Sequence, residues 1–421
     1  MKRLLSSAAT IAVVGILWQA YAEDWSRYSN SFQIGFPGYS GSSALTDFPV
    51  LVRLSPELNG FRYAKCKIPN GGDLRFADSG GNLIPHEIDT WNEGGESLVW
   101  VKVPTLTAAT TITAYYGNSS PCAASTARVW DSGYVGVWHL GQSALPLTES
   151  TGVSRSFTAS ENKDKTPFTG RFASTGMVGG AVDFSEAVVT ERLRAGDNDN
   201  LDGFDSFTFE VWTKSDISGG KNVILSKRNH GISNFSYMMT HWNDNDGTCY
   251  FSVGHGDTST QIVKSTEMFP ARGAWAHSAV VRDTTAAANY VYLNGASKNI
   301  GNNVTYDAVQ MFSGSSELWL GGGQGWSDTT NPFNGLIDEL RISRVARSAD
   351  WIKATHDTIA ENGFTSYSSI SDNWKLFSHT FSVSFSGYAG SSALSGFPSL
   401  CVSRNTTQEQ ARASEGSRIP T

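Results

Sequence analysis

Two acidic residues in the first quarter of the chain, Glu87 and Asp89, stand two positions apart in the string "HEIDTWNE". Successive side chains of a strand point to opposite faces, so both carboxyl groups are expected on one face. Two carboxyl groups held about 5–5.5 Å apart can hydrolyse a glycosidic bond with retention of configuration. The next acid, Glu93, follows Glu87 by six positions and falls in the turn "NEGGE". We therefore interpret the string as a strand whose polar residues face solvent, and keep polysaccharide hydrolysis as the alternative.

A second set of acidic residues has the composition of a metal site. The loop "AGDNDNLDGFD" spans residues 195–205, and its candidate ligands are Asp197, Asp199 and Asp202. Hard cations prefer several oxygen ligands, so these residues predict a calcium site. The loop is not an EF-hand, because Phe209 stands where the bidentate glutamate would be. The alternative is an ordinary turn rich in Asp and Asn, which tolerate left-handed backbone conformations.

Two predicted loops combine a tryptophan with hydrogen-bonding side chains, as a sugar-binding site requires. A tryptophan ring covers the apolar face of a pyranose, while amides and carboxylates bind its hydroxyl groups. The loop "HWNDNDGT" offers Trp242, Asn243 and Asp244, and the loop "GQGWSDTTN" offers Trp326 and Asp328. Binding residues are frequent in loops, so these five are the candidate ligand-binding residues. The alternative is that each tryptophan packs into the edge of the fold.

The first 22 residues have the pattern of a secretory signal peptide. Lys2 and Arg3 precede an apolar run that ends in the small-residue site "AYA". Removing Lys2 and Arg3 from the 32 basic residues leaves 30 against 39 acidic ones, a net charge of −9. This charge and the lack of a basic cluster argue against nucleic acid as a partner. No later segment is apolar enough to span a membrane, so we expect a secreted, periplasmic or cell-surface protein.

Residues 23–120 predict a small antiparallel β-sandwich. Short segments of alternating hydrophobicity, among them "VLVRL", "DLRFAD", "SLVWVKVP" and "TITAYYG", are separated by glycine-rich turns. Cys66 and Cys122 belong to the same predicted region, and export would permit a disulfide between them. Two separate thiols are the alternative that we favour.

A Ser-, Ala- and Pro-rich linker at residues 121–132 leads to a second all-β region at residues 133–363, whose size suits a two-sheet sandwich or jelly roll. In its string "SFTFEVWTK", alternation places Phe207, Phe209 and Val211 on one face of a strand.

One helix is predicted near the end of that region, over residues 347–363. Ser348 can cap its start and Gly363 can end it. Trp351, Ile352 and Ile359 lie along one stripe, which we expect to dock on the sandwich.

The opening of the first module recurs near the end of the chain. Residues 32–49, "FQIGFPGYSGSSALTDFP", and residues 381–398, "FSVSFSGYAGSSALSGFP", share 11 of 18 positions without a gap. A serine-rich spacer at residues 364–372 precedes the second occurrence. We expect residues 373–421 to be an incomplete, poorly ordered second copy, because about two strands cannot close a sandwich. A truncation or frameshift in a longer repeat protein is our hypothesis, and the motif marks a first strand and turn rather than an active site.

Residues 133–363 resemble the laminin-G-like, concanavalin A-like lectin/glucanase superfamily of exported bacterial proteins. The resemblance covers just over half of the chain and rests on "VGVWHL", "GGAVDF", "SFTFEVWTK", "WAHSAVVRD", "YVYLNG" and above all "FNGLIDELRISRVARSADWI". Residues 30–118 resemble a bacterial domain of unknown function that often precedes laminin-G-like domains. That likeness rests on "FPVLVRLS", "DLRFAD", "HEIDTWN", "VWVKVP" and "YYGN".

The resemblance implies an all-β protein: a small antiparallel sandwich followed by a concanavalin A-like two-sheet jelly-roll sandwich. Glucanases of that superfamily carry three alternating acids on one strand, and residues 133–363 contain no such string. Asp338 and Glu339 are neighbours, and Asp338 is expected to brace a turn. We predict an exported, non-catalytic protein that binds a glycan or a surface or matrix protein, with calcium as a possible cofactor. The alternatives are a polysaccharide-degrading enzyme of that superfamily and a structural surface protein without a ligand.

Overall fold

The computed structural model describes residues 23–372 apart from short internal gaps. These residues belong to one compact unit, which ends at Leu376. The predicted signal peptide and the predicted second copy, residues 1–22 and 373–421, lie outside the described residues. The gaps are at residues 59, 125–127, 131–132, 162–170, 186–191, 217–220, 229–233, 243–247, 257–258, 266–272, 299–302, 305–309 and 324–332.

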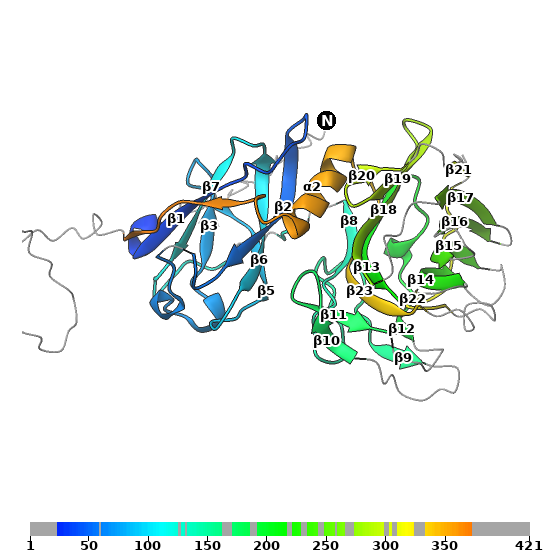
Figure 1. The fold of residues 1–421 in the computed structure, drawn as a ribbon, viewed down its shortest axis with the longest axis horizontal. Coiled ribbons are helices and arrows are strands. Elements are labelled where there is room, and N and C mark those ends of the chain that lie inside the picture. The colour runs from blue at the N-terminus through cyan, green and yellow to red at the C-terminus, as the bar shows by residue number, and fades with distance from the viewer. Residues whose placement is uncertain are drawn as a thin grey trace, which may run out of the picture. The chain divides into compact units, whose positions relative to one another are not determined.

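The first module is a small sandwich of two antiparallel sheets (Figure 1). Its strands are β1 (Asn30–Gly35), β2 (Leu45–Leu54), β3 (Arg75–Ala77), β4 (Leu83–Ile84), β5 (His86–Thr90), β6 (Ser97–Leu106), β7 (Thr111–Tyr116), β24 (Ser366–Tyr367) and β25 (Ser371–Asp372). One sheet has the order β24-β1-β7-β3-β4, with β25 also on β1, and the other has the order β2-β6-β5. Three short 3-10 helices, η1 (Trp25–Arg27), η2 (Tyr63–Lys65) and η3 (Pro69–Gly71), lie outside the sheets.

Alternation along β7 shows why this module forms a sandwich. Ile112, Ala114 and Tyr116 are buried, whereas the residues between them are half-buried or exposed. Every second side chain therefore enters the core between the sheets, which also contains Phe32 of β1 and Val101 of β6.

The second region is a large sandwich of two eight-stranded antiparallel sheets. Its strands are β8 (Tyr134–Trp138), β9 (Ala159–Glu161), β10 (Arg171–Thr175), β11 (Gly180–Asp183), β12 (Arg192–Ala195), β13 (Phe207–Ser215), β14 (Lys221–Arg228), β15 (Phe235–Trp242), β16 (Thr248–Gly256), β17 (Ser259–Ser265), β18 (Trp275–Asp283), β19 (Ala288–Leu293), β20 (Ala296–Ser297), β21 (Asn303–Val304), β22 (Leu318–Leu320) and β23 (Gly335–Ser343). The β13 sheet has the order β10-β11-β23-β13-β18-β19-β20, with β8 on β23. The β14 sheet has the order β21-β17-β16-β15-β14-β22-β12-β9.

The predicted faces of β13 are confirmed. Phe207, Phe209 and Val211 are buried in the core between the two large sheets. Trp212, on the opposite face, is buried in a different cluster together with core residues of the small sandwich. Both faces of β13 are thus covered, the second one by elements outside the large sandwich.

The single predicted helix is present as α2 (Ala349–Ala360), with Ser348 as its cap. The Ser348 hydroxyl accepts a hydrogen bond from the backbone N–H of Trp351 at 3.2 Å. The helix ends at Ala360, before Gly363. It packs on β2 of the small sandwich, where the Leu51 N–H donates to the Thr358 hydroxyl at 3.0 Å. The helix is therefore shared between the two sandwiches, not confined to the large one as its position in the sequence indicated.

Part of the predicted spacer is also paired with the small sandwich. Ser371 and Asp372 pair with Ser31 and Asn30 of β1. Tyr367 pairs with Ile34 of the same strand. The chain thus returns to the first module after completing the large sandwich, and supplies it with edge strands.

The repeated motif marks the first strand, the following turn and the start of the second strand, as predicted. In the loop between β1 and β2, the backbone N–H groups of Ser42 and Ser43 donate to Asp350 of α2, at 2.9 and 3.0 Å. Gly38 lies so close to Phe364 that a Cβ atom there would be 2.5 Å from the Phe364 Cα. Gly38, Ser42 and Ser43 have identical counterparts in the second occurrence of the motif. The motif therefore retains the residues that contact α2 and Phe364 in the first module.

The predicted linker is in part a packing element, because Val129 and Trp130 are buried in the core cluster of the small sandwich. Cys66 and Cys122 are free thiols, so the pairing that the sequence left open is not formed. Among the described residues, no helix has the length and hydrophobicity needed to cross a membrane.

Candidate functional site

One outer face of the large sandwich is covered. On the β13 sheet, Trp212, Ala279 and Tyr292 are buried in the same cluster as Trp351 of α2. That cluster extends into the small sandwich, for example to Val101. The part of the β13 sheet around Trp212, Ala279 and Tyr292 is therefore closed to a ligand.

The outer face of the β14 sheet carries arginines around a buried tryptophan. Arg194, Trp319 and Ser226 stand side by side on β12, β22 and β14. The guanidinium of Arg192 lies 4.6 Å from the centre of the Trp319 ring, and that of Arg194 lies 6.0 Å away. The Trp319 ring makes cation–π contacts with both guanidinium groups and is 1% exposed. It is therefore not available as an aromatic surface for a sugar.

The strands on either side of β14 run toward one rim of the sheet. β15 and β22 both run antiparallel to β14 and so run toward its Lys221 end, but β15 ends opposite Lys221 whereas β22 ends opposite Leu225, in the middle of β14. Trp242, the last residue of β15, pairs with Lys221, the first residue of β14. Just after β22, the Gly321 N–H donates to the Ile224 carbonyl at 2.8 Å. We call this end of β14, β15 and β22 the Lys221 rim.

The two predicted ligand-binding segments follow the two strands that run toward the Lys221 rim, β15 and β22. Asn243 and Asp244 directly follow Trp242, and Trp326 and Asp328 follow β22. These four residues and the side chain of Trp242 lie outside the described residues, so their role in binding stays a prediction. The shared rim was not apparent from the sequence, because the two segments are far apart along the chain.

Lys227 of β14 lies between two of the three candidate metal ligands, Asp197 and Asp202. Lys227 Nζ lies 2.6 Å from Asp197 Oδ1 and 2.9 Å from Asp202 Oδ2. It also donates to the carbonyls of Gly314 and Ser316, at 3.1 and 2.6 Å. The ammonium thus takes the oxygen-lined position that a cation would need.

The loop residues therefore do not fit calcium in this arrangement. Asp199 is exposed, in the 3-10 helix η4 (Asp199–Leu201), and takes no part in the lysine contacts. Within the described ranges, no group of three or more His, Cys, Asp or Glu side chains could hold a metal ion. Calcium binding stays a prediction, and the geometry counts against it because Lys227 already supplies the positive charge.

Replacing Lys227 by methionine is expected to lower the free energy of unfolding by about 3–5 kcal/mol, because fully buried Asp202 would lose its counter-charge. Urea-induced unfolding at pH 7 measures the loss. The exposed substitution Asp199→Asn is the matched control and should change stability by less than about 0.5 kcal/mol. Equal losses in the two variants would contradict a structural role for Lys227.

The acidic string in the first module faces the large sandwich. Glu87 Oε2 accepts a hydrogen bond from Trp130 Nε1 at 2.8 Å, and Oε1 accepts one from the Ser150 hydroxyl at 2.7 Å. The expectation that the string faces solvent is therefore wrong for Glu87, whose side chain is 32% exposed. Glu93 is exposed and accepts a hydrogen bond from Trp91 Nε1 at 3.3 Å, apart from Glu87.

A buried histidine links this glutamate to the large sandwich. His139, just after β8, is 4% exposed. Its Nδ1 lies 2.7 Å from Glu339 Oε1 of β23, and its Nε2 lies 3.7 Å from Glu87 Oε1 of β5. Glu339 Oε2 also pairs with Arg341 Nη2 at 2.6 Å. In the sequence, His139 stands beside apolar residues in "VGVWHL", and nothing near it indicates its carboxylate partners.

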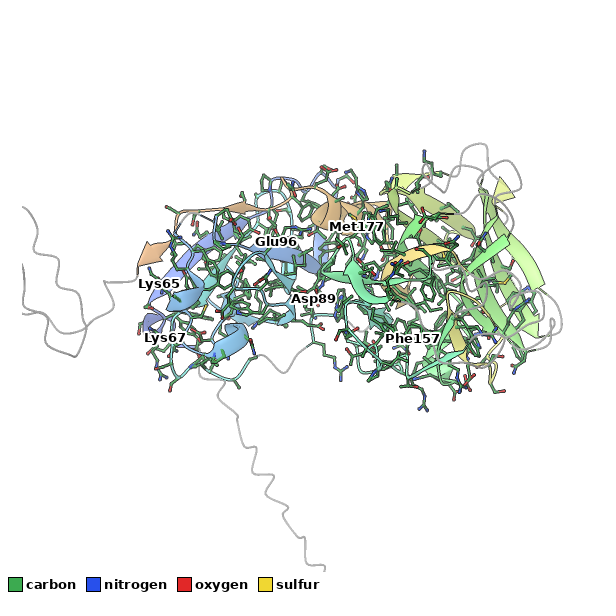
Figure 2. All side chains as sticks on the ribbon, turned by 60° about the horizontal axis from the view of Figure 1, so that its bottom comes forward. Lys65, Lys67, Asp89, Glu96, Phe157 and Met177 are labelled. Atoms are coloured by element: carbon green, nitrogen blue, oxygen red, sulfur yellow. The ribbon has the colours of Figure 1, made fainter. Side chains whose placement is uncertain are left out.

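A tight turn of the large sandwich reaches β5 close to these groups (Figure 2). Asp338 Oδ2 accepts hydrogen bonds from the N–H groups of Met177 and Val178, at 2.7 and 3.0 Å. The prediction that Asp338 braces a turn is therefore confirmed. Gly179 in that turn has a φ of +61°, and a Cβ there would lie 3.1 Å from Asp89 Oδ2. We call the titratable residues at this junction the His139 cluster: Glu87, Asp89, His139, Asp338, Glu339 and Arg341.

Burial and neighbouring charges separate the pKa values of these acids. Burial raises the pKa of Asp89 to about 6, with His139 opposing and Glu339 adding to the effect. Burial and the Glu339 charge raise the pKa of Asp338 well above its usual value. Burial also acts to raise the pKa of Glu339, but His139 and Arg341 outweigh it and lower that pKa. The pKa values of neighbouring acids in the cluster are therefore shifted in opposite directions, up for Asp89 and Asp338 and down for Glu339.

Solved structures similar to this chain include carbohydrate-associated domains. Domain 4 of AbnA, a GH43 extracellular arabinanase from Geobacillus stearothermophilus, in complex with arabinotriose, is 21% identical with a TM-score of 0.39, covering 52% of this chain and 96% of that one. A heptameric SAP-like pentraxin from Limulus polyphemus is 15% identical with a TM-score of 0.34. The match covers 42% of this chain and 80% of the pentraxin chain. The CBM40 of the Ruminococcus gnavus IT-sialidase, bound to α2,3-sialyllactose, is 16% identical with a TM-score of 0.34, covering 42% and 96%.

Two parts of the chain match known families; one lies within residues 133–363, and the other overlaps residues 30–118 but extends through the predicted linker. Residues 70–132 match a domain of unknown function, DUF2341. Residues 190–353 match the concanavalin A-like lectin/glucanases superfamily. None of the curated proteins matches the chain. The chain thus carries a domain of the concanavalin A-like lectin/glucanases superfamily, preceded by a DUF2341 domain.

Proposed function

We propose that the protein is an exported, non-catalytic binding protein whose large sandwich recognises a glycan at the Lys221 rim. The observation that carries this proposal is that β15 and β22, on either side of β14, both run toward its Lys221 end. Each is followed by a segment that combines tryptophan with Asn or Asp. The residue types in the two segments supply the aromatic surface and the polar groups that a sugar ring needs.

The burial of part of the outer face of the β13 sheet also favours ligand binding at the Lys221 rim. Trp212 and its neighbours on the β13 sheet are buried beneath α2 and the small sandwich. The β14 sheet and its rims are where a ligand meets the large sandwich.

The contacts of Glu87 support a non-catalytic role. Both of its carboxylate oxygens already accept hydrogen bonds, from Trp130 and Ser150. A nucleophilic carboxylate needs free access to the sugar and a second carboxyl group about 5–5.5 Å away. Glu93, the further acid of the string, is exposed and bonds to Trp91 instead.

The signal-peptide pattern of residues 1–22 supports export, which would bring the protein to extracellular glycans or to surface and matrix proteins. Calcium is not required by the proposal, since the ammonium of Lys227 already lies between Asp197 and Asp202 and pairs with both.

A glycan array probed with the full mature chain, in buffers with calcium and with a chelator, tests the proposal. We expect binding to at least one class of glycan in both buffers. Binding to no glycan in either buffer would contradict glycan recognition and favour a protein ligand or a structural role.

A further inference from the structure

His139 stands between two carboxylates that come from different sandwiches. Its Nδ1 faces Glu339 of β23 at 2.7 Å, and its Nε2 faces Glu87 of β5 at 3.7 Å. The ring also stacks 5.9 Å from Trp100 of the small sandwich, at an interplanar angle of 17°. A single imidazole thus contacts charged and aromatic groups on both sides of the junction.

The number of protons on the His139 ring determines how many carboxylates it can donate hydrogen bonds to. A protonated imidazole has two N–H donors and a positive charge, whereas a neutral one has a single donor. Glu339 keeps a second cation, because Arg341 pairs with it at 2.6 Å. Among the described residues, the partners of Glu87 besides His139 are the neutral donors Trp130 and Ser150. Loss of the proton therefore weakens the contact to Glu87 more than the contact to Glu339.

We propose that His139 is a proton-dependent clamp that holds β5 of the small sandwich against β23 of the large one. The clamp is closed when both ring nitrogens carry a proton, and it loosens on the Glu87 side when the ring becomes neutral. It gives the domain of unknown function a pH-sensitive attachment to the concanavalin A-like domain. This inference does not depend on glycan binding.

The titratable groups near the His139 ring on β5 and β23 determine whether the clamp strengthens or weakens as the pH rises. Burial alone would lower the pKa of His139, but Glu339 and Glu87 together raise it well above its ordinary value. A base with a raised folded-state pKa stabilises the fold at low pH, and that contribution is lost as the pH rises through the folded pKa. Asp89 and Asp338, whose pKa values are also raised, act in the same direction because their ionisation becomes costly. Arg341 stays charged throughout. The clamp should therefore weaken with increasing pH.

NMR of the full chain with ¹³C-labelled histidines tests the clamp directly. We expect the His139 resonance to titrate well above pH 6.5, and Glu87→Gln to shift that titration to lower pH. His277 is the internal control, because burial lowers its pKa and it should not titrate in this range. The spectra of His139→Gln and His277→Gln assign the two resonances. Titration of His139 at or below pH 6.5, or no shift in Glu87→Gln, would overturn the proposal.

Hydrogen exchange of the β5 amides tests whether β5 loosens when His139 loses its proton. After correction for the intrinsic pH dependence of exchange, we expect at least tenfold lower protection above the pKa of His139 than at pH 6. Glu317→Gln is the matched control, since it removes the Arg194–Glu317 pair on the β14 sheet and should leave this difference unchanged. Equal corrected protection of β5 at both pH values in the wild-type chain would show that His139 does not clamp the junction.

Discussion

Replacing Trp351 by alanine is expected to lower the free energy of unfolding by about 3–5 kcal/mol, because a large buried ring would leave a cavity. Trp351 is 6% exposed and packs on both sandwiches. The centre of its ring lies 4.9 Å from that of Phe48 in β2 and 6.4 Å from that of Tyr134 in β8. The guanidinium of Arg347 lies 4.0 Å from the same ring. The cavity would therefore open where α2 joins the two sandwiches.

Urea-induced unfolding followed by circular dichroism measures this loss. Val345→Ala is the control, since Val345 is 37% exposed and its truncation should cost less than about 0.5 kcal/mol. A loss for Trp351→Ala no larger than that of the control would show that α2 does not connect the two sandwiches.

Replacing Arg341 by methionine is expected to lower the free energy of unfolding by about 3–5 kcal/mol at pH 7, because Glu339 would be left buried with a single partner. Arg341 and Glu339 are both buried, with 2.6 Å between Nη2 and Oε2. The guanidinium also lies 4.6 Å from the ring of Trp100 and 5.0 Å from that of Trp130. The substitution thus removes a counter-charge and two cation–π contacts between the sandwiches.

The double variant Arg341→Met/Glu339→Gln separates these two effects. Removing the buried charge together with its partner should restore a large part of the lost stability. The residual loss reports the cation–π contacts to Trp100 and Trp130. A double variant as unstable as the sum of the two single variants would contradict a direct coupling between Arg341 and Glu339.

The sequence predicted those features that depend on neighbouring residues. Alternation alone placed Phe207, Phe209 and Val211 on the core face of β13, because successive side chains point to opposite sides of a strand. The turn between β19 and β20 is likewise a local feature: Asn294 and Gly295 have φ values of +50° and +74°, which Asn-Gly tolerates well. Local geometry determines such features, so a short window of sequence is sufficient.

Features that depend on distant partners were missed. The stripe on α2 indicated that one face of the helix is buried, but not that β2 of the first module covers it. The serine-rich segment at 364–372 has little apolar pattern, because β24 and β25 are short strands at the edge of a sheet. Nothing near Asp197 and Asp202 in the sequence shows that Lys227 pairs with both.

The acidic string shows the same limitation at the candidate site. Its spacing correctly indicated a strand, β5, but the environment of Glu87 depends on His139 and Ser150 from beyond the first module. Side-chain spacing within a strand defines a face, and only tertiary structure defines what that face meets.

The affinity of the mature chain for the glycan that it binds best, compared between the wild type and three tryptophan variants, tests the central claim most directly. Trp242→Ala and Trp326→Ala should each weaken binding about tenfold, because an aromatic–sugar contact contributes about 1 kcal/mol or more. Trp91→Ala, in the small sandwich, should leave the affinity unchanged. An unchanged affinity in the Trp242→Ala/Trp326→Ala double variant would contradict glycan recognition at the Lys221 rim.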